Sequence, residues 1–215
     1  MFVGKRMTRN LVTVARDTSI LKVKNLLKQH KIDQIPVVDD RKLVGIITDR
    51  DIRVNLPSPA STLSVHELNY LLSEMKTENV MTGKVFTTTP ETTIEEAALL
   101  INDKHVNSLP VVVGDELVGL ITTCDLLNIL LEIMGVHSAP SSRVELRLSS
   151  NIGEIARIAN IINEMGLRIV SLVSTIDKDN SEVCTTLVRI GTDNTGELCR
   201  VLEDVGYTVV DEYRV

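Results

Sequence analysis

The sequence predicts an α+β protein that consists of a duplicated N-terminal module and a smaller C-terminal domain. The run LVGIITDRD at residues 43–51 returns as LVGLITTCD at residues 117–125, which is 74 residues later. The tripeptide PVV at 36–38 returns at 110–112 with the same interval. Self-similarity at a fixed period normally means that each copy is one structural unit that buries its apolar face against its neighbour. We therefore expect residues 1–135 to fold as two packed repeats, with a different plan beyond them.

The composition is that of a globular protein that can bury a core. Of the 215 residues, 43% are hydrophobic and 24% are charged, which is an ordinary balance. The formal net charge is −6, whereas proteins that bind nucleic acid usually carry a basic stripe that neutralises phosphates. Aromatic residues make up 2% of the chain and tryptophan is absent, so stacking platforms for bases are unavailable. We expect no nucleic-acid partner.

The sequence shows neither a catalytic motif nor a membrane-spanning segment. No run approaches the roughly 18 apolar residues that a span requires, and the N-terminus lacks the apolar region of a signal peptide. The cysteines stand far apart without a C-x-x-C pair, and the histidines lack metal-ligand spacing. We therefore expect a cytoplasmic protein that is no enzyme, does not enter a membrane, and has no metal or catalytic cofactor. The residues considered are Cys124, Cys184, Cys199, His30, His66, His105 and His137.

The pattern of each copy predicts a strand, then a helix, and then two further strands. In the first copy we expect a short strand at 10–15, a helix at 20–30, and strands at 34–40 and 42–48. The polar turns DDRK and VGDE separate β-branched runs at hairpin distance in the two copies. The last two strands of each copy should therefore be antiparallel neighbours.

Capping boxes predict where two later helices begin. Thr92 and Glu95 have this spacing in the second copy, so we expect its helix to begin at that threonine. Ser64 and Glu67 have the same spacing before a helix that leads into the second copy. The preceding segment NLPSPAST, at 55–62, has no apolar period and reads as a loop. It is either a lid over a ligand or a plain connector.

The repeated T-x-x-D motif, Thr48 with Asp51 and Thr122 with Asp125, has two interpretations. One is another capping box at a strand-to-helix junction. The other is a ligand site, because a helix N-terminus favours a phosphate and an ionised carboxylate accepts hydrogen bonds from a ribose diol. The motif alone does not separate these two roles.

These motifs together resemble the cystathionine-β-synthase (CBS) domain, which occurs in tandem pairs called Bateman modules. The first copy has Met7-Thr8, IPVV at 35–38 and GIITDRD at 45–51. The second copy repeats them in register. The resemblance covers nearly all of residues 1–135 and implies an adenosine compound (AMP, ADP, ATP or S-adenosylmethionine) as an effector in the cleft between the copies.

The resemblance also implies which residues line each site. Asp51 and Asp125 would hold ribose, with Thr48 and Thr122 near the phosphate or the sugar. Each site would draw its base-lining residues from the other copy. Val12 and Ile32 would thus face the Asp125 site, and Phe86 and Val106 would face the Asp51 site, although packing in the core explains all four equally well.

The phosphate side departs from the pattern of nucleotide-binding relatives. Where a basic residue often precedes the h-P-V-V strand, this chain has Asp33 and Asn107. An acidic residue beside a polyphosphate is unfavourable because like charges repel. The first motif compensates with Arg50 and Arg53, unless these arginines simply form a solvated helix face. We expect unequal sites, with the site that contains Asp51 binding anions better.

The C-terminal part reads as a third module. The helix LLNILLEIMG, at 126–135, is apolar nearly all round, so a second subunit is a candidate for covering it. A linker follows, and then the order β-α-β-β-α-β of the split βαβ, or ferredoxin-like, plan. The expected domains are the first CBS repeat at 1–62, the second with its preceding helix at 63–135, the linker at 136–142 and the last domain at 143–215.

This last domain resembles the ACT domain, a small-molecule sensor that often binds an amino acid across a dimer. The resemblance places effector binding at Asn151, Ile152 and Gly153, although the usual acidic residue and proline before the glycine are missing. A capping box of Asn151 with Glu154 is the alternative. The whole arrangement is similar to the acetoin-utilisation AcuB-type CBS-ACT regulators.

Two functions remain open. The first is a homodimeric adenosine-nucleotide sensor that regulates a partner enzyme or pathway, since different ligand affinity in two arrangements can shift their populations. The second is a structural dimerisation module whose function lies in a partner.

Overall fold

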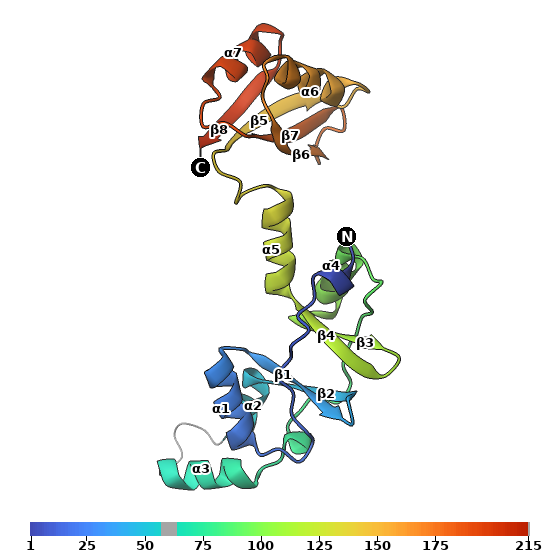
Figure 1. Cartoon of the computed structure of the whole chain (residues 1–215), viewed down its shortest axis with the longest axis vertical. Helices are drawn as coiled ribbons and strands as arrows, with labels where there is room; N and C mark the ends of the chain where they lie inside the picture. Colours follow the sequence, from blue (N-terminus) through green and yellow to red (C-terminus); the bar gives the residue numbers. More distant parts are fainter. Residues whose placement is uncertain (57–63, 215) are drawn as a thin grey trace. The chain divides into compact units, whose positions relative to one another are not determined.

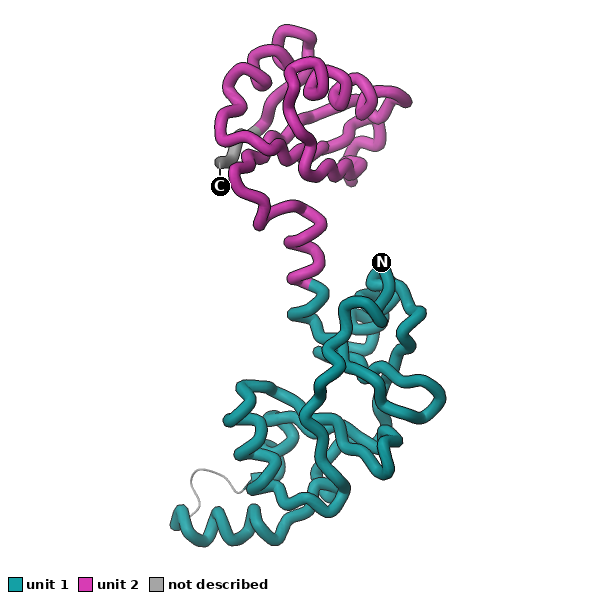
Figure 2. The backbone as a smooth tube through the Cα atoms, viewed as in Figure 1, with its two compact units in different colours: residues 1–126 teal, residues 127–215 magenta. Residues whose placement is uncertain are grey.

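The computed structural model describes residues 1–56 and 64–214, and it divides into two compact units. These are Met1–Leu126 and Leu127–Val215 (Figure 2). Most of the expected loop at 55–62 lies outside the described residues, so its role as a lid or connector stays a prediction.

The first unit contains both copies of the repeat except the C-terminal part of α5, which belongs to the second unit (Figure 1). The first copy comprises α1 (Ile20–His30), β1 (Gln34–Asp39), β2 (Lys42–Thr48) and α2 (Asp49–Asn55). The second comprises α4 (Ile94–Lys104), β3 (Ser108–Val113), β4 (Glu116–Thr122) and α5 (Thr123–Ile133). The 3-10 helix η1 (Val3–Lys5) precedes the first copy, and α3 (Val65–Glu74) and η2 (Thr77–Asn79) precede the second.

The two hairpins form one sheet in the order β1-β2-β4-β3. Strands β1 and β2 are antiparallel, as are β3 and β4, which confirms the expected hairpins. The short strand expected at the start of each copy is only a single parallel bridge, Val14 to Val37 in the first and Thr88 to Val111 in the second. These segments cross from one copy to the other and therefore run beside a strand for only a short distance.

The start of each copy packs on the opposite copy. The backbone of Thr8 exchanges two hydrogen bonds with Leu120 of β4, at 2.9 and 3.0 Å. In the same way, Thr82 exchanges bonds of 2.9 and 3.0 Å with Ile46 of β2. The two M-T motifs therefore join the repeats by reciprocal exchange.

Helix α3 belongs by its packing to the first copy, although we expected it to form part of the second. Leu72 of α3 and Val80 are buried in the same cluster as Ile20, Ile35 and Ile47. The apolar stripe of α3 thus covers the core of the copy that precedes it.

Capping decides where α4 and α3 begin. The expected start of α4 at Thr92 is wrong, because Thr93 is the N-cap and forms the box with Glu96 at 3.0 and 3.2 Å. Thr92 instead accepts a hydrogen bond from Thr89 in the preceding turn. The sequence TTIEE places each of two threonines three residues before a glutamate. Thr92 is hydrogen-bonded in the preceding turn, so Thr93 caps the helix. The expected box of Ser64 with Glu67 is confirmed.

These exposed capping boxes predict that the free energy of unfolding decreases at acid pH. The hydrogen bonds from Thr93, first from its backbone and then from its side chain, lower the pKa of Glu96 from its usual 4.5. A lowered folded-state pKa contributes stability that is present above 4.5 and is lost as the pH falls through the lowered value. In Glu96→Gln, the free energy of unfolding from urea titrations should therefore fall less between pH 6 and pH 3 than in the wild type. Glu95→Gln is the matched control, and an equal change in both variants would contradict the assignment.

The second unit has the expected order β-α-β-β-α-β (Figure 1). Its elements are β5 (Ser142–Ser149), α6 (Glu154–Glu164), β6 (Ile169–Ile176), β7 (Val183–Ile190), α7 (Gly196–Asp204) and β8 (Thr208–Arg214). The strands pair in the order β6-β7-β5-β8, and every pair is antiparallel. Alternate residues of β5 (Val144, Leu146 and Leu148) are buried with residues of both helices, so α6 and α7 cover the same face.

Helix α5 ends against the sheet of this unit. Gly135 adopts φ 67°, and bonds from Gly135 to Glu132 and from Val136 to Leu131 complete the helix end in the manner of a Schellman motif. The carbonyl of Met134 accepts hydrogen bonds from Nε of the buried Arg189 at 3.0 Å and from a serine hydroxyl of β6 at 2.9 Å. A cation at this position complements the helix dipole.

Candidate functional site

The first candidate site lies where β2 runs into α2. Thr48 is the N-cap of α2, and its Oγ1 accepts a hydrogen bond from the backbone of Asp51 at 3.1 Å. Oδ2 of Asp51 in turn accepts bonds from the backbone and the hydroxyl of Thr48, at 2.8 and 2.7 Å. The threonine and the aspartate therefore hold each other in a fixed position.

The second candidate site has the same geometry. Oδ2 of Asp125 accepts bonds of 2.8 Å from both the backbone and the hydroxyl of Thr122, and Thr122 accepts from the backbone of Asp125 at 3.2 Å. In each carboxylate only Oδ2 is used, and Oδ1 has no partner among the residues that the structure describes. An ionised carboxylate oxygen accepts further hydrogen bonds. The capping role is thus present in both copies and leaves Oδ1 of each aspartate able to accept further hydrogen bonds.

A side-chain hydrogen bond links the two strand starts that lie opposite the caps. Gln34 begins β1 opposite Thr48, and Ser108 begins β3 opposite Thr122. The hydroxyl of Ser108 donates to Oε1 of Gln34 at 2.7 Å, which joins these two strand starts directly. The strand starts that pair with the two threonine caps are therefore in direct contact.

Those preceding residues are held by backbone bonds to their own caps. The carbonyl of Asp33 accepts from the amide of Asp49, and the carbonyl of Asn107 accepts from the amide of Thr123, both at 3.0 Å. Asp33 and Asn107 are exposed. The acidic Asp33 and the neutral Asn107 thus stand at corresponding positions beside the two helix starts.

The residues expected to line the base differ in exposure. Val12 and Ile32 are half-buried and pack against the core of the first copy. Phe86, at the position that corresponds to Val12, is 41% exposed, and Nζ of Lys104 lies 5.4 Å from the centre of its ring. Val106 is half-buried. Packing explains the first pair, whereas the exposed Phe86 ring needs a further explanation.

The two helix starts carry different charge. Arg53 forms an ion pair with Asp49 one turn earlier, so its charge is partly neutralised. Arg50 is exposed and has no counterpart in the second copy, where Cys124 takes its place. The side chain of Cys124 is exposed at the second residue of α5, although a small thiol beside an apolar strand is usually buried.

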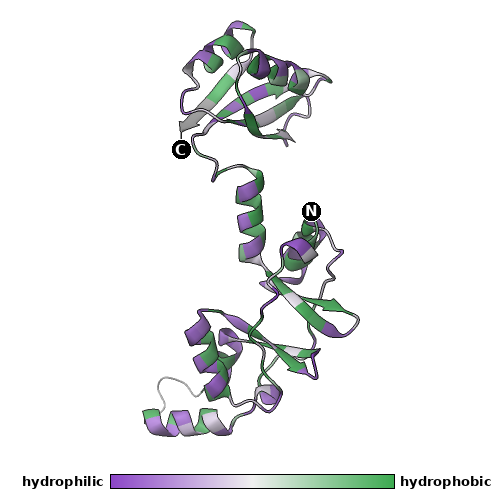
Figure 3. Cartoon of the chain, viewed as in Figure 1, coloured by the Kyte–Doolittle hydropathy of each residue, from purple (hydrophilic) through white to green (hydrophobic). Residues whose placement is uncertain are grey.

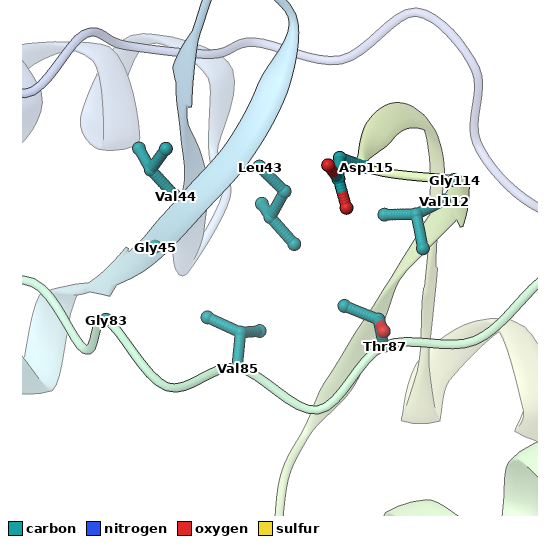
Figure 4. Close-up of a pocket in the computed structure, with 9 residues that line it drawn as sticks. All are labelled: Leu43, Val44, Gly45, Gly83, Val85, Thr87, Val112, Gly114 and Asp115. Carbon is teal, nitrogen blue, oxygen red and sulfur yellow. The ribbon is translucent and has the colours of Figure 1, made fainter.

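A cavity that we did not expect lies at the other end of β2 (Figure 4). Its volume is about 160 Å³, whereas pockets for small ligands usually measure about 300–1,000 Å³. The feature of the sequence that could have indicated this cavity is the presence of glycines among its lining residues. It is lined by Leu43, Val44, Gly45, Gly83, Val85, Thr87, Val112, Gly114 and Asp115.

The loop between β5 and α6 is open to solvent at Ile152 and Gly153. Ile152 is fully exposed, and no atom lies within 4 Å of the position that a Cβ of Gly153 would take. Gly153, with φ 98°, is the N-cap of α6 and makes no side-chain cap. The alternative capping box of Asn151 with Glu154 is therefore wrong, and Glu154 instead accepts a bond from Tyr207 at 2.8 Å.

Neither a metal-binding cluster nor a membrane-spanning helix occurs among the described residues. Within 1–56 and 64–214, no group of three or more His, Cys, Asp or Glu side chains is placed to hold a metal ion. Over the same ranges, no helix has the length and apolar character needed to cross a membrane.

Comparison with known proteins identifies relatives of the first unit. The family model of the CBS domain matches residues 3–58 and 77–132. A CBS domain-containing protein of Dictyostelium discoideum is 32% identical over 136 residues, which cover 62% of this chain and 94% of that protein.

Two solved structures are similar over the same region. An acetoin utilization protein (AcuB) from Vibrio cholerae aligns with a TM-score of 0.53 and 28% identity, covering 64% of this chain and 95% of that one. The structure of CBSX2 in complex with AMP aligns with a TM-score of 0.53 and 30% identity, covering 61% of this chain and 97% of that one.

Proposed function

Because this chain belongs to the CBS-domain family, we propose that it is a regulatory protein whose paired repeats bind an adenosine compound. The observation that carries the proposal is the pair of identical Thr-Asp caps, each with one carboxylate oxygen left without a partner among the described residues. The AMP complex of CBSX2, which is 30% identical, supports AMP as the first ligand to test. ADP, ATP and S-adenosylmethionine share the same adenosine group.

In this proposal, Oδ1 of Asp51 and Oδ1 of Asp125 accept hydrogen bonds from ribose hydroxyls. Thr48 and Thr122 hold the aspartates in place and lie near the sugar or the phosphate. A site shared between the copies is supported by the Gln34–Ser108 bond, which links the strand starts opposite the two caps. The base-lining residues are then Val12 and Ile32 for the Asp125 site and Phe86 and Val106 for the Asp51 site.

The two sites differ in their affinity for anions. Arg50 and the neutral Asn107 contribute to the Asp51 site, and Lys104 beside Phe86 adds a second cation. The Asp125 site has no such arginine, and Asp33 lies in the segment from which its base-lining residues come. Phosphorylated ligands therefore prefer the Asp51 site.

The C-terminal unit extends the proposal to a second signal. The antiparallel order β6-β7-β5-β8, with both helices on one face, supports an ACT domain that senses an amino acid near Asn151, Ile152 and Gly153. Three residues of α5 (Leu127, Leu130 and Ile133) expose 50–54% of their surface at helical spacing. Hydrophobic colour runs along this helix in Figure 3. Such a stripe supports a homodimer. Ligand binding would shift the arrangement of the subunits and so regulate a partner enzyme.

A second function, a dimerisation module with empty clefts, is favoured by one observation. Both aspartates already complete capping boxes, so the fold alone gives each of them a role. Binding data separate the two functions.

The test is titration of the full chain with AMP in a calorimeter, together with thermal unfolding. The sensor function predicts heat of binding and a rise in Tm, because a ligand that binds only the folded state stabilises it. Arg50→Gln should weaken the tighter of two unequal sites, whereas Arg53→Gln, at an arginine already paired with Asp49, should have a smaller effect. If saturating AMP, ATP and S-adenosylmethionine all leave heat and Tm unchanged, the dimerisation module is the correct function.

A further inference from the structure

One side-chain hydrogen bond between the copies joins two residues at equivalent positions of the repeat. The hydroxyl of Ser108, at the start of β3, donates to Oε1 of Gln34, at the start of β1, over 2.7 Å. These residues are 74 positions apart, as the two caps are. Lys42 of β2 likewise pairs with its own equivalent, Glu116 of β4. Contacts between equivalent positions lie at the centre of the paired copies, so this bond is placed alike with respect to both caps.

Each partner of this bond lies beside one threonine cap. Gln34 is the cross-strand neighbour of Thr48, and Ser108 is the cross-strand neighbour of Thr122. Directly opposed residues of antiparallel strands have their side chains on the same face, with Cβ atoms about 4.5–5.5 Å apart. The hydroxyl of each threonine is in turn bonded to the aspartate of its cap. A row of neighbouring polar side chains therefore runs from one carboxylate to the other.

The bond has a direction, because its two partners differ in chemistry. A serine hydroxyl has a single hydrogen to donate, and Ser108 gives it to Gln34. Nε2 of Gln34 carries two hydrogens and has no partner within residues 1–56 and 64–214. Ser108 is only 6% exposed, and buried hydroxyls are nearly always hydrogen-bonded. The glutamine thus holds the one donor of Ser108 and keeps two donors of its own.

We propose that the Gln34–Ser108 bond couples the two nucleotide sites, so that a ligand in one site lowers the affinity of the other. This inference rests on the proposed function, in which each site combines the cap of one copy with residues near the first hairpin strand of the other. Ser108 then serves the Asp51 site, and Gln34 serves the Asp125 site. AMP in the first site accepts from the hydroxyl, and AMP in the second accepts from Nε2.

The two ligands place opposite demands on this one bond. When Nε2 of Gln34 donates to a ligand, the amide is held where Oε1 keeps the hydroxyl of Ser108, so the Asp51 site loses that donor. When the hydroxyl turns to a ligand in the Asp51 site, Oε1 loses its partner, and an acceptor left unpaired inside the protein is unfavourable. Coupling of binding free energies is reciprocal, so each ligand weakens the other by the same factor.

The test is a calorimetric titration of the full chain with AMP. In the wild type the Asp51 site, which has Arg50, fills first, and the second step reports on the Asp125 site with its neighbour occupied. Asp51→Asn reports on the Asp125 site with its neighbour largely empty. Couplings between sites typically amount to about fivefold or more. We therefore expect the Asp125 site to bind AMP at least about fivefold more tightly in Asp51→Asn than in the second step of the wild type.

Two substitutions should remove the coupling in different ways. Gln34→Ala releases the hydroxyl of Ser108, so the Asp51 site should bind AMP more tightly. Ser108→Ala leaves no hydroxyl, so the Asp51 site should gain nothing. In either background, the Asp125 site should bind AMP equally whether Asp51 is intact or replaced by asparagine. The matched control is Gln29→Ala, at an exposed glutamine of α1, which should retain the coupling of the wild type.

Three results would overturn the proposal. The first is an Asp125 site with the same affinity in Asp51→Asn and in the second step of the wild type. The second is full coupling in Gln34→Ala or in Ser108→Ala. The third is equal weakening of both sites in both variants with a lower Tm, because the bond would then only hold the copies together. A wild type that gives no heat with AMP, ATP or S-adenosylmethionine contradicts the nucleotide function itself, which two working but uncoupled sites do not.

Discussion

Replacing Asp51 and Asp125 together with asparagine should weaken AMP binding at both sites while the protein remains folded. Asparagine retains a side-chain oxygen that can accept the capping bond from the threonine backbone. It loses the negative charge that strengthens a hydrogen bond from a ribose hydroxyl. Hydrogen bonds to charged groups contribute about 1.5–3 kcal/mol, and about 1.4 kcal/mol corresponds to a tenfold change in affinity. We therefore expect each site to lose roughly tenfold or more in a calorimetric titration.

The control for this experiment preserves the cap and the charge. Thr48→Ser with Thr122→Ser keeps a hydroxyl at each N-cap, so both AMP affinity and stability should change little. Loss of a cap typically costs about 0.5–2 kcal/mol. If the asparagine variant unfolds more easily by this amount but binds AMP as the wild type does, the aspartates serve only the helices, and the sensor function loses its main support.

The Thr-Asp caps of the candidate site were predictable from the sequence because their parts are local. Thr48 and Asp51 are three residues apart, and a repeat in register makes a coincidence improbable. Whether a given side chain would be buried or exposed was less predictable. Cys124 follows an apolar strand and looks like a core thiol, but it lies on the solvent side of the first turn of α5. The cavity beside Gly45 was missed because it combines segments that are distant in the chain.

The same distinction applies to the fold. Hairpins and helices follow from local patterns, so the pairing of β1 with β2 and of β3 with β4 was correct. The reciprocal exchange was not predicted, because the pattern of M-T does not say which copy it contacts. The start of α4 was wrong by one residue, since two adjacent threonines offer the same capping chemistry and only the turn at Thr89 decides between them.

The largest effect on stability that we expect is at Gly45 and Gly119. At each of these glycines the M-T motif of one copy packs against a strand of the other copy. A Cβ on Gly45 would lie 2.6 Å from Sδ of Met81 and 3.1 Å from the carbonyl of Thr82, and Gly119 is crowded in the same way by Met7 and Thr8. The methionine could move, but the threonine carbonyl is fixed by its bond to the strand. Overpacking typically costs about 1–3 kcal/mol. Gly45→Ala and Gly119→Ala should each lower the free energy of unfolding by this amount in urea titrations.

Gly83 is the matched control, since a Cβ at this position would meet nothing within 4 Å. Gly83→Ala should change the free energy of unfolding by no more than about 0.5 kcal/mol, as is usual for surface positions. The double variant Gly45→Ala with Met81→Ala tests the cause, because a shorter side chain makes room for the new methyl group. The two changes should then be non-additive by at least about 0.5 kcal/mol. Equal effects at Gly45 and Gly83 would show that close contact between the M-T motif and the opposite glycine does not hold the two copies together.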